Sequence, residues 1–513
     1  MKKFLISILL IGVAAILLLG TLRGIPGNPD SSQFKNNLDQ ATKPFELSPE
    51  RGRYSHIFSL AEDGHYDLSK EWAEAVYPDV GYSGGKFYSF FAPGISYLAL
   101  PFYELGRYFN LAQVFTFGFI SFCAILTLIF LYKISKEIFS LPKSISILVS
   151  LTFLFATTSW SYAITLYQHH VFTLLIVSGF YAVWRYKQES RFSWVWGAVV
   201  WLNYGLAILI DYPNAILMLP IMVYFLLVSV KVKNVQNKLT IGIRSSILMT
   251  FIIFIGISVL HGYHNQIHFG SWKNLSGGIV GYKDIKENNI LTSDNSDQQL
   301  ADLSSKKNVV NFFSEDKLPF GFFTLLFSRD RGLFLFSPIL LLGIIGLFMV
   351  LRKLNIEHGV MVGLILVNLM LYSSWGDPWG GWAFGPRYLI PSMAILSIYV
   401  GVFLNQIKYK FFGKLIFFVL FAYSSAIALL GALTTNAVPP KIEADYLHTG
   451  YNFLYNWKFF KANRSGSYIY NNFLSDKLSL LQYAEIILGI IALIVIVFLF
   501  IIPKFENASS NNK

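Results

Sequence analysis

The chain has 513 residues, of which 54% are hydrophobic and 14% are charged, and its mean hydropathy is +0.51. This composition excludes a water-soluble globular protein and indicates an integral membrane protein. The formal net charge is +12, but the lysines and arginines are scattered between apolar segments, so we expect no nucleic-acid partner. The single cysteine, Cys123, excludes an intramolecular disulfide and a cysteine-rich metal site.

About twelve segments are apolar and long enough to cross roughly 30 Å of hydrocarbon as helices of about 20 residues. They are expected at 4–21, 112–132, 144–164, 170–184, 194–210, 213–230, 245–263, 332–351, 358–374, 388–404, 413–433 and 483–502. The predicted fold class is therefore an all-α polytopic membrane protein. The whole chain, residues 1–513, is expected to form a single integral membrane domain.

Basic residues mark alternate connections between these segments. They are Lys133, Lys136 and Lys143; Arg185, Lys187 and Arg191; Lys231, Lys233, Lys238 and Arg244; Arg352 and Lys353; and Lys408, Lys410 and Lys414. The positive-inside rule places these connections and both termini in the cytoplasm. We therefore expect a multi-pass protein of the cell (inner, cytoplasmic) membrane.

The opposite set of connections is then extracytoplasmic, and it includes the three longest, at 23–111, 264–331 and 434–482. The polar part of the chain is therefore expected mainly on that side. The first apolar segment follows Lys2 and Lys3, as in a signal peptide. Because no clear small-x-small cleavage site follows it, we expect a retained membrane anchor.

The connection at 23–111 is expected to carry interfacial helices. A start signal, Ser48-Pro49-Glu50, places proline in the first helical turn, and Gly64 is expected to end the helix. Between them, apolar and aromatic residues recur at helical spacing; they are Tyr54, Ile57, Phe58 and Ala61. Gly84-Gly85 predicts a turn, and a second aromatic segment follows it. Both segments fit helices that lie at the membrane surface.

Four stretches of this connection form an ordered pattern: ERGRYS at 50–55, HIFSLAED at 56–63, GHY at 64–66 and YSFFAPG at 88–94. In order and spacing this pattern resembles the first outer loop of the polytopic C-type (GT-C) glycosyltransferases, which include protein O-mannosyltransferases and lipid A aminoarabinose transferases. Further echoes of this superfamily are YQHHVFT, LIDYPNAIL, HNQIHFGSW and WGGWAFGPRYLIP. The resemblance implies a GT-C-like fold and a polyprenyl-phosphate-linked sugar as donor.

The resemblance also assigns a catalytic residue. The aspartate of the family falls on Glu50, whereas Arg51 replaces the acid that follows it and Phe91 replaces a lysine of the later segment. We therefore expect Glu50 to act as the general base. Asp63, Asp67 and Asp79 are the alternatives if the register of the pattern differs. Each of these four acids could instead be a solvated loop carboxylate.

Sugar transfer from a polyprenyl phosphate also needs cations that hold the departing phosphate. Arg53, Lys86 and Arg387 are the candidates, because they are expected on the outer face and can donate to phosphate oxygens. Arg387 follows WGDPWGGWAFGP, in which Trp382 offers a flat face suited to a sugar ring. The alternative interpretation is an interfacial tryptophan belt with one snorkelling arginine.

Four further residues are substrate-binding candidates. Tyr54 and Tyr88 lie in the pattern of the first outer loop. His170 opens one predicted helix and Asp211 closes another, and ionisable groups at membrane depth are functional candidates. Histidines together with Asp211 or Asp377 leave a divalent metal open as a cofactor, but no ligand spacing indicates a site, so we assign no metal ligand.

We predict that the chain is an enzyme, a membrane glycosyltransferase of the cell envelope that transfers a sugar from a polyprenyl-phosphate donor to a glycan, lipid or protein acceptor on the extracytoplasmic face. A lipid-linked donor is consistent with the sequence because it contains no phosphate-binding glycine loop and no Asp-x-Asp in a soluble domain. The alternatives are a transporter or flippase of a lipid-linked or small solute and a non-catalytic envelope-assembly protein. Transporters usually show paired halves, whereas the two halves here differ in loop length.

Overall fold

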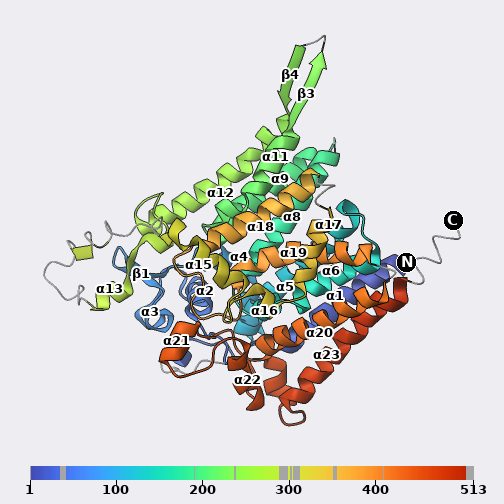
Figure 1. Ribbon diagram of the computed structural model, residues 1–513. Coiled ribbons are helices and arrows are strands. Elements are labelled where there is room, and N and C mark those ends of the chain that lie inside the picture. The colour runs from blue at the N-terminus through green and yellow to red at the C-terminus, as the bar shows by residue number, and fades with distance from the viewer. Residues whose placement is uncertain are drawn as a thin grey trace.

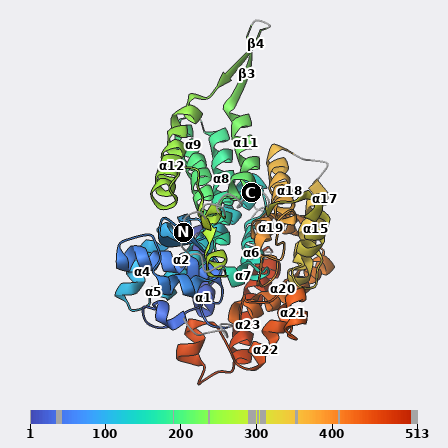
Figure 2. The ribbon, with the colours of Figure 1, turned by 90° about the vertical axis from the view of Figure 1, so that its left-hand side faces the viewer.

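The computed structural model of the chain describes residues 2–34, 42–189, 191–235, 238–287, 299–300, 303, 312–350, 355–407 and 410–503. Over these residues the protein is a helical bundle with very little strand. Figures 1 and 2 show long helices packed side by side, with the β3–β4 hairpin (Val230–Val235 and Lys238–Ile243) projecting from one end.

Seven helices of the described part are long and apolar enough to cross a membrane. They belong to α5 (Ala112–Lys133), α9 (Ser193–Ile210), α12 (Ser245–Phe269), α18 (Ile356–Ser373), α19 (Ile390–Gln406), α20 (Phe411–Leu433) and α23 (Leu480–Ile496). Shorter apolar helices lie within α1 (Lys2–Thr21) and in α6 (Lys143–Phe155), α11 (Leu219–Ser229) and α17 (Leu340–Val350). The predicted all-α polytopic fold is confirmed, while the count of twelve spans stays a prediction.

The remaining elements are shorter, apart from α8 (His169–Gln188). They are α2 (Ser48–Phe58), α3 (Lys70–Val76), β1 (Val80–Ser83), β2 (Lys86–Ser89), α4 (Gly94–Tyr108), α7 (Ser159–Tyr162), α10 (Asn214–Leu217), β5 (Val280–Gly281), α13 (Tyr282–Glu287), α15 (Leu318–Leu326), α16 (Leu333–Phe336), α21 (Lys441–Tyr446) and α22 (Phe453–Lys461). Most of them lie in the long connections between the apolar helices.

Three of the predicted spans are interrupted. The segment 144–164 divides into α6 and α7, because the hydroxyls of Thr157 and Ser159 both donate to the carbonyl of Phe153, each at 2.6 Å, where the helix ends. The segments 213–230 and 332–351 also divide, into α10 and α11 and into α16 and α17. Pro220 and Pro338 lie at these breaks, and proline lacks the N–H that would continue a helix.

The helices of the bundle approach closely where small residues face a neighbour. A Cβ atom added at Gly346 of α17 would lie 2.0 Å from the carbonyl oxygen of Tyr399 in α19. A Cβ atom added at Gly343, one turn earlier, would lie 2.5 Å from the carbonyl oxygen of Leu396. Glycine therefore permits near contact of the two backbones, as is common between membrane helices.

The predicted start and end of the first-loop helix are confirmed. Pro49 lies in the first turn of α2, and a π turn continues the helix to Asp63. Gly64 ends it in the left-handed conformation, with φ of +72°. Tyr54 and Ile57 of α2 are fully buried, because α3, α4 and β2 pack around the helix.

The three long connections meet at one end of the bundle. In the first connection, β1 and β2 form an antiparallel hairpin around Gly84-Gly85, where a turn was predicted. The second connection contributes β5, which pairs with β1. Arg23 of the first connection forms a β-bridge with Ser467 of the third. The three long connections therefore contact one another in the structure, and the side of the membrane on which they lie stays a prediction.

Candidate functional site

A group of buried and half-buried polar side chains lies where the long connections meet the bundle. We call it the open cluster and define it by Glu50, Arg51, Arg53, Tyr167, Gln168, His169, Asp211 and Arg387. Four parts of the chain supply it: the start of α2, the residues around the start of α8, the end of α9 and the loop before α19. Tyr167 is at its centre, within electrostatic range of both Glu50 and Arg387.

Glu50 lies in the first turn of α2, where the proline start signal places it. Its side chain is 1% exposed. The Oε2 atom accepts a long hydrogen bond of 3.4 Å from the backbone N–H of Leu47, and Oε1 has no hydrogen-bond partner among the described residues. Burial, and then the nearby carboxylate of Glu46, raise the pKa of Glu50 from 4.5 to about 7. The group can therefore exchange a proton near neutral pH.

Arg53 lies one turn further along α2. Its Nη1 donates to the carbonyl of Pro49 at 2.9 Å and its Nη2 donates to Oε1 of Gln168 at 2.7 Å. Gln168 in turn donates to Oδ2 of Asp211 at 3.1 Å, and the guanidinium of Arg53 lies over the Phe91 ring at 4.6 Å. The Nε atom is buried without a partner among the described residues. Gln168 thus links Arg53 to Asp211, the second acid of the cluster.

Arg387 approaches from the opposite side, in the loop before α19. Its guanidinium lies 5.3 Å from the ring centre of Tyr167 and 5.5 Å from that of Tyr388. The Nε and Nη1 atoms are buried, and neither has a hydrogen-bond partner in the described part of the chain. Gly380 permits this position, because a Cβ atom there would lie 3.1 Å from Nε of Arg387.

A second arginine holds the loop that carries Arg387. Arg331 is fully buried and donates to the backbone carbonyls of Trp379, Gly381 and Val438, each at 2.9 Å. Asp377 accepts from the backbone N–H of Gly381 within the same loop at 2.5 Å. These contacts fix the tryptophan- and glycine-rich loop without using any donor of Arg387.

The open cluster concentrates polar atoms that have no partner in the described residues. They are Oε1 of Glu50, Nε of Arg51, Nε of Arg53, the hydroxyl of Tyr167, Nε2 of His169 and the two nitrogens of Arg387. Buried polar groups in proteins are normally hydrogen-bonded, and each one left unpaired costs about 1–3 kcal/mol. Guanidinium donors on one side and a carboxylate oxygen on the other would be satisfied by a ligand that carries both an anion and a hydroxyl.

Four residues predicted as site residues are therefore together in the open cluster: Glu50, Arg53, Asp211 and Arg387. His170 is buried beside it, with Nε2 2.7 Å from the carbonyl of Ser159. No role was predicted for Tyr167, which contacts Arg387, or for Gln168, which accepts from Arg53. The available signal was the run of polar residues at 167–170 between two apolar segments.

The other acid candidates have different surroundings. Asp79 accepts from the hydroxyl of Ser48, next to the start of α2, and lies within electrostatic range of Arg51. Asp67 forms an ion pair with Lys86 at 2.8 Å, so the structure places this cation candidate with an acid rather than with Arg387. Asp63 is exposed at the end of the π turn.

The aromatic candidates lie outside the open cluster. Tyr54 packs within the core, with ring centres 4.6 Å from Phe45 and 5.7 Å from Tyr103. Tyr88 packs against His268 at 5.7 Å and belongs to a separate group of aromatic and histidine rings. Trp382 donates from its indole nitrogen to Glu443 of the third long connection at 2.5 Å.

No group of three or more His, Cys, Asp and Glu side chains in the described residues is arranged to hold a metal ion. The two acids that the sequence left open as ligands make other contacts. Asp211 accepts from Gln168, and Asp377 from the backbone of Gly381.

No family model and no curated protein matches the chain. Solved structures similar to it include the Archaeoglobus fulgidus oligosaccharyltransferase in its apo form, at 12% identity and a TM-score of 0.49, over 91% of this chain and 59% of that one. Another is the archaeal oligosaccharyltransferase AglB in complex with an inhibitory peptide and a dolichol-phosphate, at 11% identity and a TM-score of 0.45, over 93% and 60% of the two chains.

A third similar structure is ArnT from Cupriavidus metallidurans bound to undecaprenyl phosphate, at 13% identity and a TM-score of 0.48, over 96% of this chain and 76% of that one. The chain spans about three fifths of the length of the oligosaccharyltransferase it matches. At these identities the likeness is one of fold alone.

Proposed function

We propose that this protein is a membrane glycosyltransferase that moves a sugar from a polyprenyl-phosphate donor to an acceptor on the extracytoplasmic face. One observation carries the proposal: the open cluster combines a buried carboxylate oxygen and buried guanidinium N–H groups, none of which has a partner in the described residues. A base for the acceptor hydroxyl and cations for the departing phosphate are what the reaction requires.

In the proposed reaction, Glu50 takes the proton of the acceptor hydroxyl. The acceptor oxygen forms a bond to the anomeric carbon of the sugar, and the bond between that carbon and the phosphate oxygen breaks. Its electron pair stays on the phosphate, so polyprenyl phosphate leaves. A pKa of about 7 suits this role, because a general base is most effective when its pKa is close to the working pH.

Arg387 is the proposed anchor of the phosphate. Its Nε and Nη1 are unpaired donors on one planar, permanently charged group, so each can donate to a phosphate oxygen. Arg53 supplies a second positive charge that is already fixed by Pro49 and Gln168. A rigid charge stabilises the leaving phosphate without reorganisation during the reaction.

Glu50 is the preferred base among the four candidate acids. Its carboxyl carries a buried oxygen without a partner in the described chain, whereas Asp79 accepts from Ser48 and Asp67 is paired with Lys86. Asp63 is exposed, so its environment leaves it an ordinary surface acid. Asp211 is held by Gln168 and is proposed to orient the Arg53 side of the site.

The proposal is tested with purified protein in lipid, radiolabelled polyprenyl-phosphate sugars and a membrane extract as the source of acceptors. We expect the label to leave the carrier lipid and to appear in an acceptor. Label that remains on the lipid but crosses the membrane of a vesicle would instead favour a flippase. If the label neither leaves the lipid nor crosses the membrane, a non-catalytic assembly protein becomes the better interpretation.

The side of the membrane on which the open cluster lies is predicted from the charges of the connecting loops. Reporter fusions at Tyr451, in the third long connection, should report the extracytoplasmic side, and fusions at Lys410 the cytoplasm. The reverse result would place the open cluster in the cytoplasm and contradict the proposed use of an outward-facing donor.

A further inference from the structure

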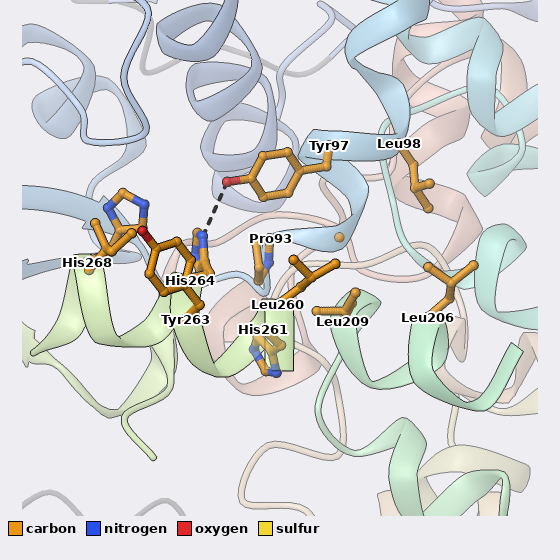
Figure 3. Close-up of a pocket in the computed structure, with 12 residues that line it drawn as sticks. Pro93, Tyr97, Leu98, Leu206, Leu209, Leu260, His261, Tyr263, His264 and His268 are labelled. Atoms are coloured by element: carbon orange, nitrogen blue, oxygen red, sulfur yellow. Dashed lines mark hydrogen bonds between the residues drawn. The ribbon is translucent and has the colours of Figure 1, made fainter. Parts of the chain in front are cut away.

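A cavity of about 400 Å³ lies between α4, α9 and α12 (Figure 3). Its walls are mostly apolar. The lining residues are Pro93, Gly94, Tyr97, Leu98, Leu206, Leu209, Leu260, His261, Tyr263, His264, Ile267 and His268. This set contains no lysine, arginine, aspartate or glutamate, so the part of any ligand that fills the cavity should carry no charge.

The cavity faces the outside of the bundle. Leu260, Tyr263 and Ile267 of α12 line it and are 70%, 58% and 57% exposed. Because α12 is one of the helices long and apolar enough to cross a membrane, these exposed side chains are expected to face lipid. A hydrocarbon chain can therefore enter the cavity from the bilayer.

One wall of the cavity is polar. The Nε2 atoms of His261 and His264 are buried and have no hydrogen-bond partner among the described residues. Figure 3 shows the Tyr97 hydroxyl directed at His264, and it lies 3.2 Å from Nδ1. When Tyr97 donates to Nδ1, Nε2 of His264 carries the ring proton and can donate to a ligand. Pure hydrocarbon would leave these buried groups unpaired, which is unfavourable.

The cavity adjoins the open cluster at two points. Leu209 of its wall is two residues from Asp211 at the end of α9. Pro93 is two residues from Phe91, whose ring lies 4.6 Å from the guanidinium of Arg53. A lipid that occupies the cavity would therefore lie beside the segments that carry Asp211 and the Phe91 contact of Arg53.

We propose that this cavity binds the acceptor, and that the acceptor is an acyl lipid. Its chain lies against the leucines, and its ester or amide carbonyl accepts from Nε2 of His261 and His264. A polyprenyl chain has no such groups, and the phosphate of the donor is assigned to the arginines of the open cluster. The inference rests on the proposed function and narrows the acceptor class from glycan, lipid or protein to acyl lipid.

Binding is tested first, with radiolabelled dioleoylglycerol as the probe and undecaprenol, which has a terminal hydroxyl but no carbonyl, as the polyprenyl comparison. Leu206→Trp should fill the cavity and weaken dioleoylglycerol binding by about tenfold or more, since the chain is displaced from apolar contact. Leu202→Trp is the matched control: Leu202 lies one turn away on α9, is 40% exposed and does not line the cavity. Equal binding by both variants would overturn the proposal.

The histidines are tested by substitution to alanine. His264→Ala should weaken dioleoylglycerol binding by about three- to tenfold, the usual effect of losing one neutral hydrogen bond, while His264→Gln should retain most of it. Undecaprenol binding should be unchanged by either substitution. If undecaprenol binds more tightly than dioleoylglycerol and is the ligand displaced by Leu206→Trp, the cavity is a donor-chain site and the proposal is wrong.

Transfer is tested next with labelled donor. Label should pass to dioleoylglycerol and not to glycerol, and Leu206→Trp should raise the KM for dioleoylglycerol while donor affinity stays the same. Equal transfer to glycerol would overturn the acyl-lipid assignment. Failure of transfer to every acceptor in the extract would contradict the proposed function and the acceptor role with it, whereas the binding experiments report on the cavity alone.

Discussion

Two buried glutamates close together in the sequence, Glu46 and Glu50, differ in how many hydrogen bonds their carboxylates accept. Glu46 is 4% exposed and fully engaged: Oε2 pairs with Arg23 at 2.5 Å and accepts from the backbone of Asn436 at 2.7 Å, and Oε1 accepts from Thr42 at 2.9 Å. Glu50 is 1% exposed, yet Oε1 has no partner among the described residues. The first carboxylate joins the first and third long connections, and the second is left available.

Arg331 and Arg387 also differ in how many of their side-chain donors are used. Arg331 is fully buried and donates to four backbone carbonyls, whereas Arg387 keeps two buried nitrogens without a partner in the described chain. We call Glu46 and Arg331 the closed group. Burial alone therefore does not mark a functional charge, because the closed group stabilises the fold with the same residue types. What distinguishes the open cluster is its unused hydrogen-bonding capacity.

The largest expected effect is the loss of activity when Glu50 is substituted. Glu50→Gln should lower turnover by about two to four orders of magnitude, the usual contribution of a general base, with donor binding nearly unchanged. Glu50→Asp should retain more activity, since the carboxylate remains. Asp79→Asn and Asp63→Asn are the controls. A fully active Glu50→Gln variant together with an inactive Asp79→Asn variant would move the base to Asp79.

The closed group should respond in stability instead. Glu46→Gln removes the negative partner of buried Arg23, and breaking a buried ion pair typically costs about 3–5 kcal/mol. We expect a lower unfolding temperature for Glu46→Gln in detergent and little change for Glu50→Gln. A Glu46→Gln variant that is as stable as the native protein would remove the contrast between the two carboxylates.

The raised pKa of Glu50 predicts that turnover and folding stability both depend on pH. Because only the ionised base can take a proton, turnover should rise as the pH increases through about 7 and then level off. Burial raises this pKa above the ordinary value of 4.5, so the contribution of Glu50 to folding stability is fully present below about pH 4.5 and is lost as the pH rises through about 7. The native protein, but not Glu50→Gln, should show this loss in thermal unfolding. A turnover that stays constant from about one pH unit below that pKa to about one unit above it would contradict the assignment of Glu50 as the base.

The smallest effect is expected at Lys86. Its side chain is 55% exposed and pairs with Asp67, and exposed ion pairs contribute only about 0–1 kcal/mol. Lys86→Gln should therefore change the KM for the donor by less than about fivefold, with unchanged stability. A loss as large as that of an Arg387 variant would place Lys86 at the phosphate after all.

Much of the fold was accessible from the sequence. Apolar run length predicted the polytopic helical bundle, and local signals at Pro49 and Gly64 predicted where the first-loop helix begins and ends. The interruptions of three predicted spans were not anticipated, because hydropathy averages over a window and does not register the breaks near Pro220 and Pro338.

The open cluster was only partly accessible. Glu50, Arg53, Asp211 and Arg387 were candidates, but nothing in the sequence showed that segments so far apart converge. Their proximity depends on the packing of long connections, and Gln168 bridges two of them through contacts that no local pattern encodes. Likewise Lys86 looked like a phosphate ligand until its ion pair with Asp67 was visible.

We expect the open cluster, and not the closed group, to hold the lipid-linked phosphate. The most direct measurement is equilibrium binding of radiolabelled undecaprenyl phosphate to the native protein and to Arg387→Gln, with Arg107→Gln as a control at an exposed arginine paired with Glu62. We expect Arg387→Gln to weaken binding by about one to two orders of magnitude, the effect of losing charged hydrogen bonds to phosphate, and Arg107→Gln to bind as the native protein does. Equal affinity of all three proteins for the lipid phosphate would contradict the account.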